Sequence, residues 1–346
     1  MSFRTSELRV VCTGLGYPEG PVAMPDGSVL LVELAAGTLS RISSAGQRTV
    51  VATMGGSPNG AAIGPDGKVY VCNSGGFSFL YVSRAGISPT PSPGAIAVTT
   101  DAAPGYTGGS IQRVDLASGT VETLYTEFPG LLGDGMHLLR APDDLVFDDH
   151  GGFWFTDWGH TRGRTRDITG VCYARADGTL IREALYPLNA PNGIALSPDG
   201  TRLYVAETYT RRVLAWDLAA PGEIARTGPT ADFSRLLTAA IPGQGILDSL
   251  KVDAEGNVYV VTMLPEGQVF ESNGGITVIA PSGQILDFIE LAAGGVFDPL
   301  PSNLCFGGPD RRTAFITCGG SGRLLACEMR VSGLQAAMVR PPLELP

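Results

Sequence analysis

Short runs of apolar residues recur along the whole chain, and each follows a turn rich in glycine, proline or aspartate. Six of these runs are rich in β-branched or aromatic residues: Val29–Glu33, Val69–Cys72, Phe153–Thr156, Leu203–Ala206, Val258–Val261 and Ala314–Thr317. Short runs of this composition, bounded by turn residues, are typical of β-strands. No apolar pattern with the 3.6-residue period of a helix extends over a comparable length. The pattern therefore predicts an all-β protein.

The turns before these runs resemble one another. In each copy, an acidic or amide residue stands six positions before the first residue of a turn such as Pro25-Asp-Gly27 or Pro198-Asp-Gly200. The six lead residues are Glu19, Asn59, Asp143, Asn192, Asp248 and Asn303. They are 40, 84, 49, 56 and 55 residues apart. Strand–turn–strand units with a period of about 40–55 residues are typical of a β-propeller, and six copies predict six blades.

We expect a single propeller domain over residues 1–346, with an elaborated insertion around residues 84–141 between the second and third blades. The segment Leu8–Cys12 precedes the first repeat and is predicted to form the outer strand of the last blade, which would close the ring and remove an exposed edge. A doubly wound α/β fold would require helical crossovers between the strands, which the sequence lacks. If the chain formed two separate β-sandwiches, there would be no reason for a single repeat to run through both halves.

Composition and charge narrow the choice of partners. Charged residues make up only 17% of the 346 residues, and the formal net charge is −10. Binding to nucleic acid or to an anionic membrane requires a basic face, and we expect neither partner. The three histidines argue against a multi-histidine zinc site. The absence of a long apolar run predicts a soluble, cytoplasmic protein. We expect it to be a monomer or small homo-oligomer, with its six cysteines reduced.

The lead residues themselves point to chemistry. The first strand of each propeller blade lines the central channel, so the six side chains are expected to form a ring of three carboxylates and three amides. Hard divalent cations, Ca²⁺ above all, prefer such oxygen ligands. Asn and Asp also occur before strands because they form turns, and this alternative suits Asn59 and Asn192, each followed by glycine. It does not suit Glu19, nor does it explain three carboxylates that would repel one another without a cation.

Several motifs together resemble the gluconolactonase/regucalcin (senescence marker protein) family of six-bladed propellers. They are Tyr17-Pro-Glu-Gly-Pro21, Phe153-Trp-Phe-Thr-Asp157, Pro191–Gly200 and Leu247–Asp253. The resemblance extends from Glu19 to about Cys327. It implies a lactonase-type hydrolase with one divalent cation, usually calcium, with Zn²⁺, Mn²⁺ or Mg²⁺ also possible, held by Glu19, Asn192 and Asp248.

Two departures from the family pattern change the expected site. The third-blade position, normally Asn, is Asp143, which we expect to act as a fourth ligand or to lie one water from the cation. Family members that act on sugar lactones carry an arginine two residues earlier, where this chain has Ala141. The substrate pocket is expected to include Asn59, Asn303, Tyr17, Trp158, Tyr209 and Met263. A lactone or ester with fewer hydroxyl groups is therefore the expected substrate.

The expected mechanism is metal-assisted hydrolysis, with Asp248 or Asp143 removing a proton from the attacking water. Three alternatives stay open: a phosphotriesterase-type hydrolase, a strictosidine-synthase-like enzyme and a non-catalytic calcium-binding propeller. The sequence lacks the GxSxG motif, so a serine triad would have to recruit His137 or His160 near the channel mouth.

Overall fold

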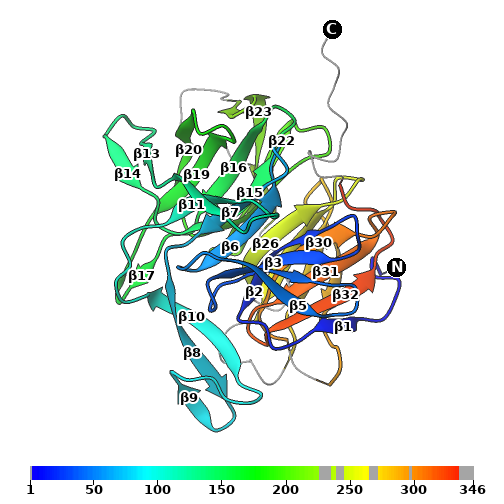
Figure 1. The fold of residues 1–346 in the computed structure, drawn as a ribbon. Coiled ribbons are helices and arrows are strands. Elements are labelled where there is room, and N and C mark those ends of the chain that lie inside the picture. Colours follow the sequence, from blue (N-terminus) through cyan, green and yellow to red (C-terminus); the bar gives the residue numbers. More distant parts are fainter. Residues whose placement is uncertain (1, 226–234, 239–244, 265–271, 296–297, 335–346) are drawn as a thin grey trace.

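Antiparallel sheets follow one another along the chain in the computed structural model, which describes residues 2–225, 235–238, 245–264, 272–295 and 298–334 (Figure 1). Blade one contains β2 (Pro18–Ala23), β3 (Val29–Glu33), β4 (Thr38–Ile42) and β5 (Arg48–Thr53). Blade two contains β6 (Pro58–Ile63), β7 (Val69–Asn73), β11 (Ser110–Val114) and β12 (Val121–Tyr125). Blade three contains β15 (Pro142–Phe147), β16 (Gly152–Asp157), β19 (Thr169–Arg175) and β20 (Ile181–Leu188).

The second half of the chain repeats this arrangement. Blade four contains β21 (Pro191–Leu196), β22 (Arg202–Glu207), β23 (Arg212–Ala220), β24 (Glu223–Ile224) and β25 (Arg235–Thr238). Blade five contains β26 (Ile246–Val252), β27 (Val258–Met263), β28 (Gly275–Ile279) and β29 (Ile285–Glu290). Blade six contains β30 (Pro301–Gly307), β31 (Thr313–Cys318), β32 (Arg323–Glu328) and β1 (Arg9–Cys12).

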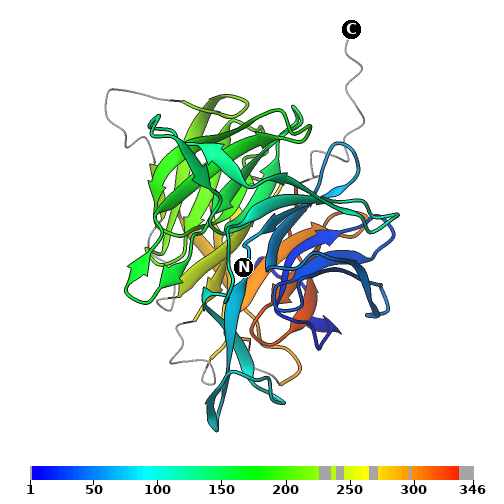
Figure 2. The same cartoon turned by 60° about the vertical axis from the view of Figure 1, so that its left-hand side comes forward.

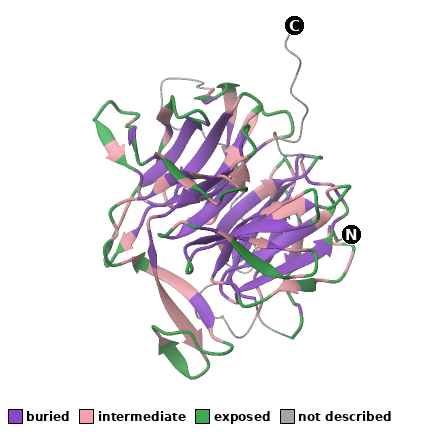
Figure 3. Cartoon of the chain, in the orientation of Figure 1, coloured by how far each residue is buried: buried purple, intermediate pink, exposed green. Residues whose placement is uncertain are grey.

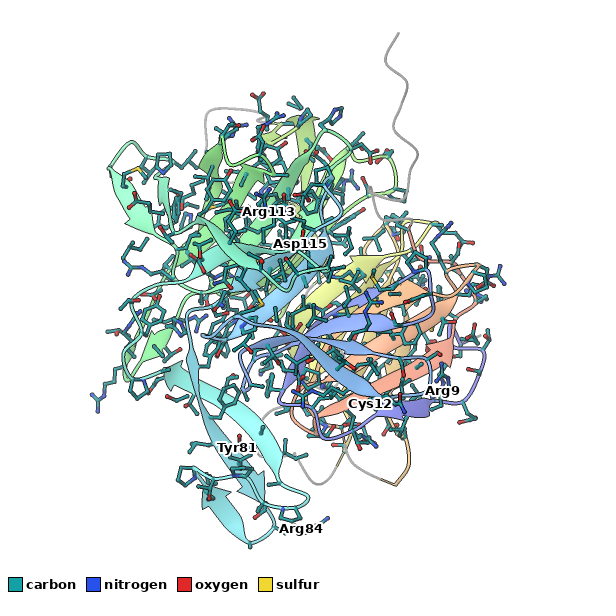
Figure 4. All side chains as sticks on the ribbon, in the orientation of Figure 1. Arg9, Cys12, Tyr81, Arg84, Arg113 and Asp115 are labelled. Carbon is teal, nitrogen blue, oxygen red and sulfur yellow. The ribbon has the colours of Figure 1, made fainter. Side chains whose placement is uncertain are left out.

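The six blades close into a ring, as predicted. Each first strand contacts the first strand of the next blade, in the order β2, β6, β15, β21, β26, β30 and back to β2. The terminal strand β1 pairs with β32, so the chain's N-terminal segment completes the last blade. Figure 1 shows this dark blue strand beside red β32, and Figure 4 labels Arg9 and Cys12 on it. The all-β six-bladed propeller with an N-terminal closing strand is confirmed.

The hydrophobic core lies between the blades. Because side chains alternate across a strand, the second strand of a blade can pack against both neighbouring blades. Leu30 and Val32 of β3 pack against blade two, whereas Val29 and Leu31 pack against blade six. Similar clusters fill the other four interfaces. This burial on two faces, visible as purple strands in Figure 3, explains why those strands read as unbroken apolar runs.

The predicted insertion has a different layout from the one expected. The structure divides residues 84–141, because β11 and β12 inside this range are ordinary strands of blade two. One elaboration lies within blade two, between β7 and β11, and contains β8 (Phe77–Ser83), β9 (Gly86–Ser88) and β10 (Ile96–Ala102). We call these three strands the arm. The other is the hairpin of β13 (Glu127–Pro129) and β14 (Met136–Leu138), between blades two and three.

The arm projects from the ring of blades in both orientations (Figures 1 and 2). Figure 4 labels Tyr81 and Arg84 on it, and Arg113 and Asp115 at the far end of blade two. A smaller hairpin of β17 (Thr161–Arg162) and β18 (Thr165–Arg166) interrupts blade three. All six cysteines are free, as expected. Within the described ranges, no helix has the length and apolar character needed to cross a membrane.

Candidate functional site

The six lead residues occupy equivalent places on the six inner strands. Each lies at the second or third position of its strand, and all six side chains are buried. The pairing register of each inner strand shifts at or beside its lead residue, as between Pro58 and Ala61 around Asn59. A β-bulge changes the direction of a side chain, which explains how these residues come to face one another around the axis.

Carboxylates and amides alternate around this ring, and each amide is paired with the carboxylate of the following blade. Asn59 Nδ2 donates to Asp143 Oδ2 at 2.9 Å, and Asn303 Nδ2 donates to Glu19 Oε2 at 2.8 Å. Asn192 hydrogen-bonds to the side chain of Asp248. Each pair joins two blades, so the ring orients its own carboxylates through neighbouring strands.

The glycines that follow three of the lead residues have a structural reason that differs from turn formation. A Cβ on Gly20 would lie 2.5 Å from the backbone oxygen of Asn59, and one on Gly193 would lie 2.2 Å from the backbone nitrogen of Leu250. These glycines therefore allow adjacent inner strands to approach closely enough for the ring to form. The backbone is also strained before two of the ring residues, since Tyr17 and Ala190 have φ angles of 59° and 51°.

Two oxygens of the ring have no hydrogen-bond partner although they are buried. These atoms are Asp143 Oδ1 and Asn192 Oδ1. Leaving a buried acceptor unpaired costs about 1–3 kcal/mol, so such atoms call for an explanation. No three Asp, Glu, His or Cys side chains of the described residues gather closely enough to hold a metal on their own. A cation here would therefore need the amide oxygen of Asn192 beside the carboxylates, and this mixed oxygen set suits calcium.

Burial and mutual repulsion dominate the electrostatics of the ring. Burial, followed by the charge of Asp248, raises the pKa of both Glu19 and Asp143 well above the ordinary carboxyl range. Burial raises the pKa of Asp248 to about 8, although its hydrogen bond from Asn192 acts in the opposite direction. A divalent cation among these groups would favour their ionised forms. The residues present therefore fit a hard cation.

The ring residues form the floor of a cavity of about 130 Å³. Glu19, Asn59, Asp143, Asn192 and Asp248 all line it. Asn303 is not among the described lining residues: it is fully buried within the ring and donates to Glu19, so the structure does not place it in the cavity wall as the sequence expected.

The walls of the cavity are largely apolar and aromatic. Tyr17, Trp158, Tyr209 and Met263, which the sequence assigned to the substrate pocket, line it. The arm contributes Phe77, Val98 and Thr99, which the sequence did not identify because the arm carries no copy of the repeat. The ring of Phe79, also on the arm, packs on Tyr17 with centroids 5.7 Å apart. The arm therefore forms part of the cavity wall.

An arginine supports the aromatic wall from behind. The Arg166 guanidinium lies 3.9 Å from the ring centroid of Trp158 and 4.9 Å from that of Tyr209. Its Nη2 donates to the Trp158 carbonyl oxygen at 2.6 Å. Arg166 is not among the described residues that line the cavity, and neither is Arg140. Ala141 is fully buried, with its backbone N–H donating to Asp157. The cavity lining thus has no guanidinium among its described residues.

A second set of buried polar residues lies at the ends of the second strands of blades one to four. Glu33 accepts a hydrogen bond from Gly16 N, Asp157 from Ala141 N, and Glu207 from Asn189 N. Asn73 accepts one from Ser57 N. Each bond fixes the loop that leads into the ring residue of the same blade. The sequence contains a signal for this set, because Glu33, Asn73 and Asp157 each follow their lead residue by 14 positions and Glu207 follows by 15.

Neither histidine considered for a serine triad reaches the cavity. His160 is buried between the rings of Phe77 and Tyr106, with Nε2 3.1 Å from the Ser74 carbonyl oxygen. His137 lies on β14, 3.0 Å from the Asp134 carboxylate. Neither is among the residues that line the cavity.

A six-bladed propeller with an alternating carboxylate–amide ring at the floor of a cavity defines the general class of this protein. Residues 17–320 match the model of the SMP-30/gluconolactonase/LRE-like region family, and the chain belongs to this family. It is 26% identical to the gluconolactonase of Zymomonas mobilis over 328 residues, which cover 88% of this chain and 76% of that protein.

One further relative and two solved structures are also similar to this chain. Lactonase drp35 of Staphylococcus epidermidis is 28% identical over 266 residues, or 75% of this chain and 66% of that protein. A gluconolactonase from Xanthomonas campestris (TM-score 0.66, 20% identity, 94% of this chain and 90% of that chain) shares the fold. So does regucalcin, a calcium-binding protein from Agrobacterium tumefaciens (TM-score 0.66, 17% identity, 97% of this chain and 98% of that chain).

Proposed function

We propose that this protein is a divalent-metal-dependent, lactonase-type hydrolase that uses calcium and opens a lactone or ester bearing few hydroxyl groups. The observation that carries the proposal is the buried ring with two unpartnered oxygens at the floor of an apolar cavity. The names of the curated relatives, gluconolactonase and lactonase drp35, support the reaction class.

Glu19, Asn192 and Asp248 would hold the cation, with Asp143 as a fourth ligand or one water away. When bound, the cation would supply Lewis-acid polarisation of the substrate carbonyl group. Asn303 and Asn59 orient Glu19 and Asp143 through their amide N–H groups.

In the proposed mechanism, Asp248, or alternatively Asp143, accepts a proton from the water that attacks the carbonyl carbon. The acyl C–O bond then breaks, and the leaving oxygen takes up that proton. A bound cation would keep Asp248 in the ionised form that a general base needs, although burial alone raises the pKa of its carboxyl group. The aromatic and apolar walls exclude bulk water and hold the apolar part of the substrate.

The cavity walls also support the proposed substrate class. A sugar lactone presents several hydroxyl groups, and each needs a hydrogen-bond partner after it leaves water. Apart from the ring residues, the described lining is mostly apolar and aromatic, with a few hydroxyl groups, such as those of Thr99 and Thr208, and no guanidinium. A lactone or ester with an aliphatic or aromatic substituent buries apolar surface here without leaving hydroxyl groups unpaired.

A hydrolysis screen tests the proposal. Sugar lactones, aliphatic lactones, aryl esters and organophosphates are compared side by side on the full chain with calcium, after chelator treatment, and after calcium is restored. We expect an aliphatic lactone or ester to give the highest kcat/KM, with loss of turnover in chelator and recovery with calcium.

Each other outcome of the screen contradicts a defined part of the proposal. Glucono-lactone as the best substrate would overturn the account of the walls, and an organophosphate as the best substrate would favour a phosphotriesterase. Turnover unaffected by chelator would overturn the metal dependence. Calcium binding without any turnover would favour a non-catalytic propeller.

A further inference from the structure

A buried ion pair crosses the central channel next to the ring. Lys251 Nζ on β26 lies 2.7 Å from Asp144 Oδ2 on β15. These strands belong to blades five and three, which are separated by blade four. The Asp144 side chain is 1% exposed and the Lys251 side chain 25%. Neither residue is among those that line the cavity.

The ammonium of Lys251 reaches from blade five to the carboxylate of Asp144 in blade three. Its charge lowers the pKa of Cys72 in blade two and of Cys305 in blade six, against the larger effect of burial on both thiols. A group that acts on blades two, three and six from a backbone in blade five must extend toward the axis. Lys251 is one of only two lysines in the chain, the other being Lys68.

The charge of Asp144 acts on the ring carboxyls, although Asp144 is not one of the six ring residues. It directly follows Asp143 in β15, and its charge raises the pKa of Glu19, Asp143 and Asp248. An unpaired Asp144 would thus add a fourth negative charge beside three carboxylates. The ammonium of Lys251 neutralises this charge at a distance of 2.7 Å.

We propose that Lys251 is a fixed positive charge of the channel, which balances Asp144 and thereby sets how tightly the ring binds a divalent cation. The inference rests on the metal-binding part of the proposed function. Lys251 is a positioning residue in this account: it acts on the cation through Asp144 and the field in the channel, without contacting substrate.

The charge-balance account predicts opposite effects for the two partners. Lys251→Met removes the positive charge and leaves Asp144 unpaired, so the site becomes more negative. Asp144→Asn leaves the ammonium unpaired, so the site becomes more positive. Coulomb interactions between partly buried charges within roughly 10 Å change an affinity by about tenfold. The double variant Lys251→Met/Asp144→Asn removes both charges and should return the affinity to nearly that of the wild type.

The experiment is calorimetric titration of calcium chloride alone into the chelator-stripped full chain. We expect a Kd about tenfold lower for Lys251→Met, about tenfold higher for Asp144→Asn, and within about threefold of wild type for the double variant. Lys68→Met removes the same charge from a surface turn and is the matched control, with unchanged affinity. Thermal midpoints in chelator give a second readout: each single variant should melt below the wild type, and the double variant should recover part of the loss.

A merely structural ion pair would weaken calcium binding in both single variants, and that result overturns the inference. Unchanged affinity in Lys251→Met also overturns it, while leaving the proposed function intact. A wild-type chain that binds no calcium overturns the metal dependence of the proposed function together with this inference.

Discussion

Two sets of buried carboxylates in this propeller differ in how well their partners satisfy them. Glu33, at the end of β3, accepts hydrogen bonds from Gly16 N at 2.7 Å, Ser40 Oγ at 2.6 Å and Arg48 Nε at 2.6 Å. Glu207 accepts from Asn189 N, Thr210 Oγ1 and Arg212. In the ring, by contrast, the Asp143 carboxylate accepts only from Asn59 and keeps one oxygen unpartnered.

Carboxylates of the two sets therefore differ in what they do: one set stabilises the blades, and we propose that the other binds a cation. Glu33 and Glu207 use their charge within their own blades to hold the loops before Glu19 and Asn192. The ring carboxylates repel one another and Asp143 keeps one oxygen unpartnered among the described residues, an arrangement that the proposed cation would stabilise. The two unpartnered oxygens support the proposal that the ring is the functional set; burial does not separate the two sets, since both are buried.

The largest expected effect is on catalysis. Asp248→Asn removes the proposed base and a charge of the metal site while keeping the shape of the side chain, so turnover should fall by about 10²–10⁴-fold. The measurement is kcat/KM on the best substrate of the screen, with circular dichroism to verify the fold. Glu7→Gln removes a charge from an exposed position and should leave kcat/KM unchanged. Full activity of Asp248→Asn would show that the ring carboxylate is dispensable.

The next-largest expected effect is on the free energy of unfolding, which allows the two sets of carboxylates to be compared directly. Glu33→Gln places an amide N–H group among three donors and weakens the ion pair with Arg48, so the free energy of unfolding should fall by about 2 kcal/mol. Glu19→Gln relieves repulsion in the ring, so the metal-free chain should be at least as stable as the wild type.

Denaturant unfolding in the presence of chelator measures both variants under the same conditions. Equal destabilisation of Glu33→Gln and Glu19→Gln would remove the distinction between the sets. With calcium present, Glu19→Gln should lose the stabilisation that the cation gives the wild type, because it weakens the site.

A third effect concerns pH. Burial raises the pKa of Asp157 to about 6 and that of Asp248 to about 8, against an ordinary value of 3.8. A carboxyl with a raised pKa binds its proton more tightly in the folded chain, so its contribution is full below the ordinary value and is lost as pH rises through the folded value. Metal-free stability should therefore decline as pH rises from about 4, less steeply above about 6, and level off above about 8.

Thermal melting across this pH range, with chelator and then with calcium, separates the two groups. Calcium should abolish the decline between about pH 6 and 8, which belongs to the ring, and leave the part of the decline below about pH 6 that belongs to Asp157. A melting temperature that is independent of pH in chelator would contradict the raised pKa values.

The smallest effect tests the arm as a wall of the cavity. Phe77→Ala removes an aromatic ring from the lining and should lower kcat/KM for a bulky apolar lactone by about tenfold, mainly through KM. Ile87→Ala, on the arm where the side chain is 68% exposed, is the matched control and should have no effect. Equal effects of the two variants would mean that the arm acts only through its general stability.

The sequence by itself determined the elements, their repetition and the ring residues. Apolar runs such as Val29–Glu33 and turns such as Pro25-Asp-Gly27 are local signals, and the constant six-residue spacing placed Glu19 and Asp248 at equivalent positions. A resemblance to known propellers then implied which of them would hold a cation. The closing role of Leu8–Cys12 was also predictable, because a ring with one incomplete blade would leave an edge strand unpaired.

Only the tertiary structure decided which side chains meet. The pairs Asn303–Glu19 and Lys251–Asp144 join residues 284 and 107 positions apart, and no local pattern encodes such contacts. Asn303 shares the repeat of the ring residues, yet it is fully buried beside Glu19 and is not among the described residues that line the cavity. The arm contributes Phe77 because a segment without the repeat packs against Tyr17 and Trp158. Local spacing fixes strands and turns, whereas the site depends on contacts that exist only after the first and last blades meet.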